Sequence, residues 1–250
     1  MLNLAVATSF PALEPDARLL AGKLNLPMAE GKQYDYLLVL TPDYLGLQKC
    51  GSKALPVFVD FLSIEMNRRR KQASLKREAL ARALGLKGQS SAKIVDATAG
   101  LGRDSFILAC LGFEVILLER SPIVFALLKD GLNRASQNEQ LAPIIARMHL
   151  IQTDALSWLK TTQPDLVYLD PMFPEKRKSA LVKKNMQFFQ EIIGNDVDAE
   201  TLLQTALTCA NNRVVVKRPR LAAPLAGQEP AFCLEGSSSR FDVYLISRTP

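Results

Sequence analysis

The feature that most constrains the fold of this chain is a regular alternation of strand-like and helical segments from about residue 92 onward. Short apolar runs rich in Val, Ile and Leu alternate with helical stretches, a pattern typical of βαβ units with parallel strands. We therefore expect a doubly wound α/β fold with a mainly parallel seven-stranded sheet, closed by an antiparallel hairpin. The expected strands are Lys93–Ala97, Glu114–Glu119, His149–Gln152, Asp165–Asp170 and Arg213–Lys217, and the hairpin strands are Ala231–Leu234 and Arg240–Ile246.

Helical patterns fill the intervals between these strands. Ser121 followed by Pro122 is typical of a helix start, and Gly112 of a helix end. The expected helices are Arg103–Leu111, residues 121–135, Ala155–Lys160, Ser179–Ile193 and Ala199–Cys209.

The first 60 residues have a different pattern. Strand-like runs at Leu4–Ala7, Tyr36–Leu40 and Val57–Phe61 are broken by Pro and Gly, and Asp16–Leu24 has helical spacing. We expect a small α/β N-terminal subdomain over residues 1–60 and the main domain over 61–250, which would open with one helix over Ser63–Leu84.

Composition bears on the cellular location of the protein and on whether it binds a metal. Hydrophobic residues make up 48% of the chain and charged residues 22%, as in ordinary globular proteins. The N-terminus lacks the pattern of a signal peptide, and no apolar run reaches the ~20 residues that a membrane span needs. The four cysteines form no C-x-x-C pair and there is one histidine. We expect a cytoplasmic protein with no metal site and no membrane partner.

Basic residues are concentrated in three segments that contain no acidic residue. Met66–Arg77, Lys176–Lys184 and Arg213–Arg220 together hold 15 of the 31 Lys and Arg residues. Such clusters favour a polyanion as partner. Charge alone does not distinguish RNA from DNA or from a membrane surface. The residues expected to contact the polyanion are Arg68, Arg69, Arg70, Lys176, Arg177, Lys178, Lys183, Lys184, Lys217 and Arg218.

A glycine-containing turn joins the first strand of the main domain to the next helix. It runs from Asp96 to Asp104 and contains Gly100 and Gly102. Small residues at the carboxyl end of a strand let the backbone approach a ligand closely. Glu119 ends the second strand and can accept hydrogen bonds from a ribose diol. Asp154, after the third strand, is placed to meet an adenine edge or to cap a helix. This set predicts an adenosine-containing cofactor without specifying which.

The segment Asp170-Pro171-Met172-Phe173-Pro174 ends the fourth strand. It resembles the Asp/Asn-Pro-Pro-aromatic motif of amino-group methyltransferases, with Met172 in place of the second proline. A carboxylate on Asp170 and the Pro171 carbonyl can accept the two N–H bonds of an exocyclic amine and so orient its lone pair. Phe173 can stack on a flipped base. We therefore expect Asp170, Pro171 and Phe173 to be catalytic.

Several motifs together resemble the bacterial ribosomal RNA small subunit methyltransferase J family. They are DATAGLGRDSF, LLERSP, LDPMFPEKRKSALVKK, VVVKRP and RFDVYL, with FVDF and NRRRK at 58–71. The resemblance covers about residues 55–250 and includes Met172. It implies a Rossmann-like class I methyltransferase that methylates a guanine exocyclic N2 in 16S ribosomal RNA, with S-adenosyl-L-methionine as donor. The partner would be 16S rRNA or the small ribosomal subunit.

The resemblance also implies which positions contact the cofactor. The family uses the two residues after the third strand, here Asp154 and Ala155, where other members carry small hydroxyl residues. Together with the glycine turn, the expected cofactor-binding residues are Asp96, Gly100, Gly102, Arg103, Asp104, Glu119, Arg120, Asp154, Ala155 and Asp170.

Other functions are compatible with parts of this pattern. An amino methyltransferase acting on DNA adenine or on a protein amide would share the Asp170 motif. A nicotinamide oxidoreductase would share the glycine turn and Glu119 but would give the Asp170 motif no role. A non-catalytic RNA-binding Rossmann module would bind RNA without S-adenosylmethionine.

Overall fold

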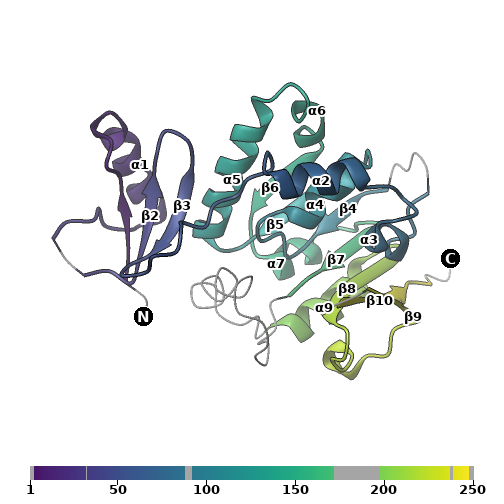
Figure 1. Cartoon of the computed structure of the whole chain (residues 1–250). Helices are drawn as coiled ribbons and strands as arrows, with labels where there is room; N and C mark the ends of the chain where they lie inside the picture. Colours follow the sequence, from purple (N-terminus) through teal and green to yellow (C-terminus); the bar gives the residue numbers. More distant parts are fainter. Residues whose placement is uncertain (1–2, 32, 88–91, 172–197, 237–238, 248–250) are drawn as a thin grey trace.

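The main sheet brings the carboxyl ends of five parallel strands to one edge (Figure 1). The structure is a computed structural model that describes residues 3–31, 33–87, 92–171, 198–236 and 239–247. The strand order is β6-β5-β4-β7-β8-β10-β9, and β10 runs antiparallel to both of its neighbours. The strands are β4 (Ile94–Asp96), β5 (Val115–Glu119), β6 (Met148–Gln152), β7 (Leu166–Leu169), β8 (Arg213–Pro219), β9 (Phe232–Glu235) and β10 (Ser239–Leu245). The expected α/β fold, with its parallel sheet and closing hairpin, is confirmed.

The order of the strands reverses beside β4. From β4 the chain proceeds to β5 and β6 on one side, and then returns to β7 on the other. Ligands bind at such a switch point in open α/β sheets, next to the carboxyl ends of the strands. Asp96, Glu119 and Asp170 end or directly follow β4, β5 and β7, so all three lie at this edge.

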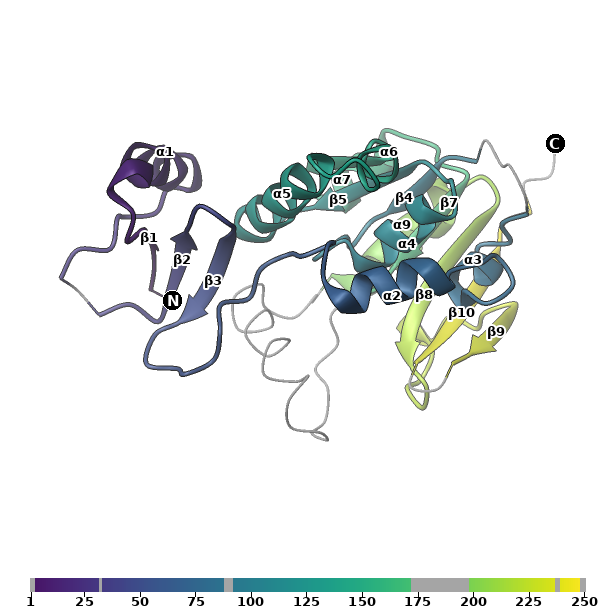
Figure 2. The ribbon, with the colours of Figure 1, turned by 45° about the horizontal axis from the view of Figure 1, so that its top comes forward.

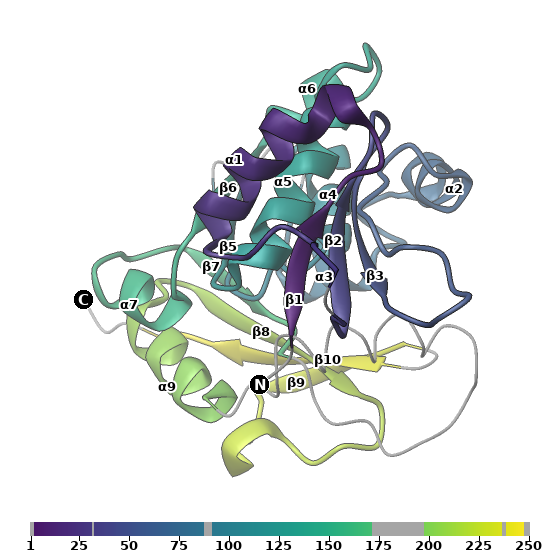
Figure 3. The ribbon, with the colours of Figure 1, turned by 90° about the vertical axis from the view of Figure 1, so that its left-hand side faces the viewer.

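Helices cover both faces of the main sheet (Figure 3). On one face, α4 (Arg103–Cys110), α5 (Pro122–Ser136) and α6 (Ala142–Ile145) pack into the larger core with residues such as Phe106, Leu127 and Tyr168. On the other face, α7 (Ala155–Lys160) and α9 (Ala199–Cys209) enclose a second core around Leu159 and Leu203. The expected helix over Ser179–Ile193 lies outside the described residues.

A separate three-stranded sheet precedes the main sheet. It contains β1 (Leu4–Ala7), β2 (Tyr36–Leu40) and β3 (Leu45–Lys49), with α1 (Glu14–Leu24) between the first two. β3 contacts α5, and the two elements lie side by side in Figure 2. The Leu45 amide donates to Asp130 of α5 at 3.1 Å. The division at residue 60 stays a prediction.

Two expectations in this part of the chain are wrong. Val57–Phe61 is not a strand. β3 is the strand that pairs antiparallel to β2, and of the segment Val57–Phe61 only Val57 forms a bridge, to Leu47 of β3. The segment instead packs beneath α5, where Val59 lies so close to Gly131 that a Cβ there would meet its Cγ1 at 2.4 Å.

The expected helix over Ser63–Leu84 is two helices. They are α2 (Ile64–Gln72) and α3 (Ala79–Ala83). The break begins at Ala73, whose backbone is extended with ψ of 132°. Ser74 then starts a new turn, in which its carbonyl and hydroxyl oxygens accept from the Arg77 amide. Among the described helices, none has the length and apolar composition that a membrane crossing requires.

Candidate active site

The two glycines of the turn after β4 serve different purposes. Both have left-handed backbones, with φ of 53° at Gly100 and 70° at Gly102. A Cβ on Gly102 would meet Leu128 Cδ1 at 2.8 Å, so this glycine lets α4 pack against α5. Among the described residues, a Cβ on Gly100 would meet only the Thr98 carbonyl, at 3.9 Å. Gly100 therefore leaves open space at the carboxyl edge, as a ligand that approaches the backbone requires.

Glu119 is fixed beside this open space. Its carboxylate is buried, and it accepts from the Gly100 amide at 3.1 Å and from the Ser121 amide at 2.7 Å. Each carboxylate oxygen can accept more than one hydrogen bond. Glu119 can therefore accept from a ribose diol while it holds the turn, and with Gly100 it fits an adenosine-bearing ligand.

Asp96, at the end of β4, also holds the turn that contains Gly100. It is 2% exposed, and its carboxylate accepts from the Ser105 hydroxyl at 2.5 Å and from the Thr98 amide at 3.2 Å. Burial raises the pKa of Asp96 to about 7. These contacts make Asp96 a scaffold for the turn, whereas its predicted contact with the cofactor stays a prediction.

Asp104 is the centre of a charged network. Arg69 Nη2 lies 2.9 Å from Oδ1, and Lys217 Nζ lies 2.9 Å from Oδ2. The Tyr168 hydroxyl also donates to Oδ2, at 2.8 Å. Burial alone would raise the pKa of Asp104, but the Lys217 and Arg69 cations outweigh it and hold the pKa well below its usual range. The network joins α2, α4, β7 and β8.

Asp170, the predicted catalytic carboxylate, is held in this network by Lys217. The two groups lie 2.8 Å apart, and the Asp170 amide donates to the Thr98 hydroxyl at 2.6 Å. The Asp170 side chain is 40% exposed, so it faces the open edge of the sheet. Pro171 is buried, and Phe173 lies outside the described residues.

The other predicted cofactor residues follow the carboxyl ends of β4, β5 and β6. Arg103 is 59% exposed, with Glu65 at 3.9 Å, and the Arg120 guanidinium lies 2.7 Å from Asp198. Asp154 caps α7 by accepting from the amide and hydroxyl of Ser157, at 2.9 Å and 2.8 Å. Burial would raise the pKa of Asp154, but these hydrogen bonds lower it. Ala155 is buried in the first turn of α7.

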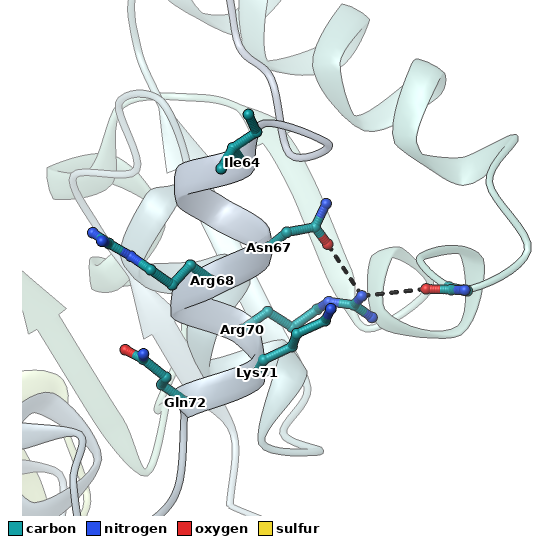
Figure 4. Close-up of a pocket in the computed structure, with 7 residues that line it drawn as sticks. Ile64, Asn67, Arg68, Arg70, Lys71 and Gln72 are labelled. Atoms are coloured by element: carbon teal, nitrogen blue, oxygen red, sulfur yellow. Dashed lines mark hydrogen bonds between the residues drawn. The ribbon is translucent and has the colours of Figure 1, made fainter.

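The predicted RNA-binding residues are placed unequally. Arg68 is exposed on α2 and borders a surface pocket of about 540 Å³ together with Arg70 and Lys71. Figure 4 shows that Arg68 leaves the opposite side of the helix from Arg70 and Lys71. Arg70 is fixed there by Asn67 at 3.1 Å and by Gln140 at 3.3 Å.

Three other members of the predicted set turn inward. Arg69 and Lys217 point to Asp104, and Arg218 is 8% exposed, with its guanidinium donating to the Ala223 carbonyl at 2.7 Å. The remaining members, Lys176, Arg177, Lys178, Lys183 and Lys184, lie outside the described residues.

Sequence reasoning missed the polar partners that fix the site. Thr98, Ser105 and Tyr168 hold Asp170, Asp96 and Asp104 respectively. Tyr168 precedes Asp170 by two residues, and alternate residues of a strand share a face, so the sequence could have placed Tyr168 near the site but not its bond to Asp104. Among the described residues, no three His, Cys, Asp or Glu side chains are grouped as a metal site would require.

Comparison with known proteins identifies the family. The sequence profile of a family of SAM-dependent methyltransferases matches residues 20–246. The ribosomal RNA small subunit methyltransferase J of Marinobacter nauticus is 48% identical, covering 99% of this chain and 93% of that protein. The protein of the same name from Thioalkalivibrio sulfidiphilus is 47% identical, covering 93% of this chain and 94% of its own length.

A solved structure gives the same result. A SAM-dependent methyltransferase from Neisseria gonorrhoeae superimposes with a TM-score of 0.74 at 35% identity, covering 99% of this chain and 97% of that one. Sequence, fold and site geometry agree. The chain belongs to the ribosomal RNA small subunit methyltransferase J family of S-adenosylmethionine-dependent methyltransferases.

Proposed function

We propose that this protein methylates the exocyclic N2 of a guanine in 16S ribosomal RNA of the small subunit, in the cytoplasm. One observation carries the proposal. The Asp170 carboxylate, in an amino-methyltransferase motif, stands at the sheet edge that Gly100 and Glu119 leave open, and Thr98 and Lys217 hold it there. The names of the relatives support ribosomal RNA as the substrate.

The residues around the glycine turn would hold the methyl donor. Glu119 would accept from the ribose hydroxyls, and the open side of Gly100 would let the ligand lie against the backbone. When bound, S-adenosylmethionine supplies a methyl group already activated by a sulfonium centre. Arg103, Arg120, Asp154 and Ala155 complete the proposed cofactor contacts.

Asp170 would orient the acceptor. The lone pair of a guanine N2 is delocalised into the ring, so the amine is a poor nucleophile until its geometry is fixed. The Asp170 carboxylate and the Pro171 carbonyl would accept its two N–H bonds, and Phe173 would stack on the base. The chemistry would then depend on alignment. The methylated amine would be acidic enough to lose its proton to water, which reaches the 40% exposed Asp170 side chain, so no strong base is needed.

The surface of α2 would hold the RNA backbone. Arg68, Arg70 and Lys71 line one pocket, and arginine forks suit phosphate oxygens. We include Lys176, Arg177, Lys178, Lys183 and Lys184 in the proposed RNA path because they follow the Asp170 motif directly in the sequence.

The test is transfer of labelled methyl from S-adenosylmethionine to small-subunit RNA, naked and assembled, from cells that lack this protein. Nucleoside analysis should place the label in N2-methylguanosine. Label in another nucleoside would overturn the base assignment. An absence of label with both RNA forms, when S-adenosylmethionine binding is confirmed, would instead indicate a DNA or protein acceptor.

A further inference from the structure

Lys217 lies inside the site and not on its surface. It belongs to β8, where successive residues face opposite sides of the sheet and alternate residues share a face. Arg213 and Lys217 share a face, so Arg213 reaches the Ala83 carbonyl of α3 and Lys217 reaches α4. The Lys217 side chain is 28% exposed, and its ammonium lies 2.9 Å from Asp104 and 2.8 Å from Asp170.

We propose that Lys217 is a positioning residue for methyl transfer, which fixes the Asp170 carboxylate by linking it to Asp104. The inference rests on the proposed function, because it assumes that Asp170 orients the acceptor amine. Lys217 itself need not touch the base, the donor or the RNA backbone.

The need for such a residue follows from charge. Asp104 and Asp170 both lie within hydrogen-bond distance of one ammonium, so without it two carboxylates would face each other across a short gap and repel. Asp170 is the more exposed of the two, so this repulsion would shift its carboxylate from the position that Lys217 gives it. With the Thr98 hydroxyl holding its amide and Lys217 holding its carboxylate, Asp170 is fixed at both ends.

The same contacts exclude two other roles for Lys217. Partial burial lowers its pKa, but Asp104 and Asp170 outweigh this and raise the pKa above the ordinary lysine value. The ammonium therefore stays protonated and does not act as a general base. An ammonium has three N–H donors, and two of them are directed at these carboxylates, which leaves Lys217 poorly placed for a phosphate.

The test compares Lys217→Met with Lys160→Met, which removes the same charge from an exposed site at the end of α7. We expect Lys217→Met to lower kcat by about 100-fold, because small misplacements at a reacting centre have effects of that size. Its affinity for small-subunit RNA, and the salt dependence of that affinity, should match the control. A salt slope reduced by about one, with kcat retained, would show a phosphate contact and overturn the inference.

Lys217→Arg distinguishes loss of the positive charge from general damage to the fold. It keeps the cation, so its kcat should recover to within about tenfold of the wild type, as expected when charge carries most of the effect. Activity of Lys217→Arg no better than that of a folded Lys217→Met would contradict a role through charge pairing.

Amine acylation of the wild-type protein tests the pairing without any variant or RNA. At pH 8.5, mass spectrometry should show Lys217 reacting at least about tenfold more slowly than exposed Lys160, since only the neutral amine reacts. Equal rates would overturn the pairing even if Lys217→Met fails to fold. Because this assay needs no substrate, its outcome is independent of whether guanine N2 is the acceptor.

Discussion

Two basic segments of this chain look alike in sequence and differ in the structure. On α2, Arg68, Arg70 and Lys71 line an open pocket, while Arg69 alone of this run reaches Asp104. At the end of β8, Lys217 enters the site and Arg218 is buried on the opposite face. A helix distributes consecutive side chains around its axis, whereas a central strand sends them into one core or the other.

The difference shows that a cluster of basic residues in the sequence does not by itself predict an exposed basic surface. On α2, Arg68 and Lys71 are exposed and Arg70 is half-buried, whereas at the end of the central strand β8 the cations neutralise carboxylates and hold a loop. Arg218 does the latter by donating to the Ala223 carbonyl. The two segments should therefore respond differently to the same substitution.

The largest effect is expected at the carboxylate that Lys217 serves. Asp170→Asn should lower kcat by about 1,000-fold, because an amide keeps the shape but supplies a neutral and partly wrong set of hydrogen-bond partners to the amine. Thermal unfolding should change little, since the side chain is 40% exposed. Single-turnover methyl transfer measures the loss, and near-normal activity would remove Asp170 from the mechanism.

The pH dependence of stability should distinguish Asp96 from Asp104, which is paired with Lys217 and Arg69. The folded pKa of Asp96 is about 7, above its unfolded value, so its stabilising effect is complete below about pH 4 and is lost as the pH rises to 7. The free energy of unfolding should thus fall by roughly 2–3 kcal/mol between pH 5 and pH 8 relative to Asp96→Asn.

Asp104 should behave in the opposite way. Its pKa is held low, so its contribution to stability is present above about pH 4 and is lost only in stronger acid. Urea unfolding at several pH values measures both groups. Equal pH dependence in wild type and Asp96→Asn would contradict the assignment to Asp96.

On α2, removal of charge should weaken RNA binding. A variant with Arg68, Arg70 and Lys71 changed to Gln should bind small-subunit RNA about 10- to 100-fold more weakly at moderate salt. The slope of log affinity against log salt should become shallower by about two to three. The matched control changes Lys23, Lys129 and Lys160, which are exposed elsewhere. An equal loss in this control would mean that general charge, and not the α2 surface, attracts the RNA.

The smallest effect on RNA is expected at Arg218. Arg218→Met should lower the free energy of unfolding by about 1–2 kcal/mol through loss of the hydrogen bond to Ala223. The salt slope of RNA binding should equal that of the wild type. A slope shallower by about one would show that Arg218 reaches a phosphate, and would contradict the distinction between the exposed cations of α2 and the buried Arg218 of β8.

Local pattern was sufficient for the core of the fold. The Val-rich run in β8 and the apolar run in β7 are buried on both faces, which is what parallel central strands require. β1 and β2 were predicted at their observed bounds. β3 was missed because Gly46 and Gln48 weaken its strand pattern, and the break at Ala73 was missed because neither Gly nor Pro marks it.

The site was predictable only in part, for a physical reason. Strand ends bring Asp96, Glu119 and Asp170 together, and these positions follow from the alternation of strands and helices. The pairing of Arg69 and Lys217 with Asp104 depends on how α2 and β8 pack against α4, over separations of 35 and 113 residues. The glycine turn and Glu119 left the cofactor class open, and the relatives decide it in favour of S-adenosylmethionine.

Mass spectrometry of 16S ribosomal RNA from cells in which the chromosomal copy carries Asp170→Asn tests the proposed role of Asp170 directly. We expect one N2-methylguanosine present in wild-type cells to disappear and to return when the wild-type protein is supplied. A 16S modification profile identical to that of the wild type, with the variant protein present and folded, would contradict it.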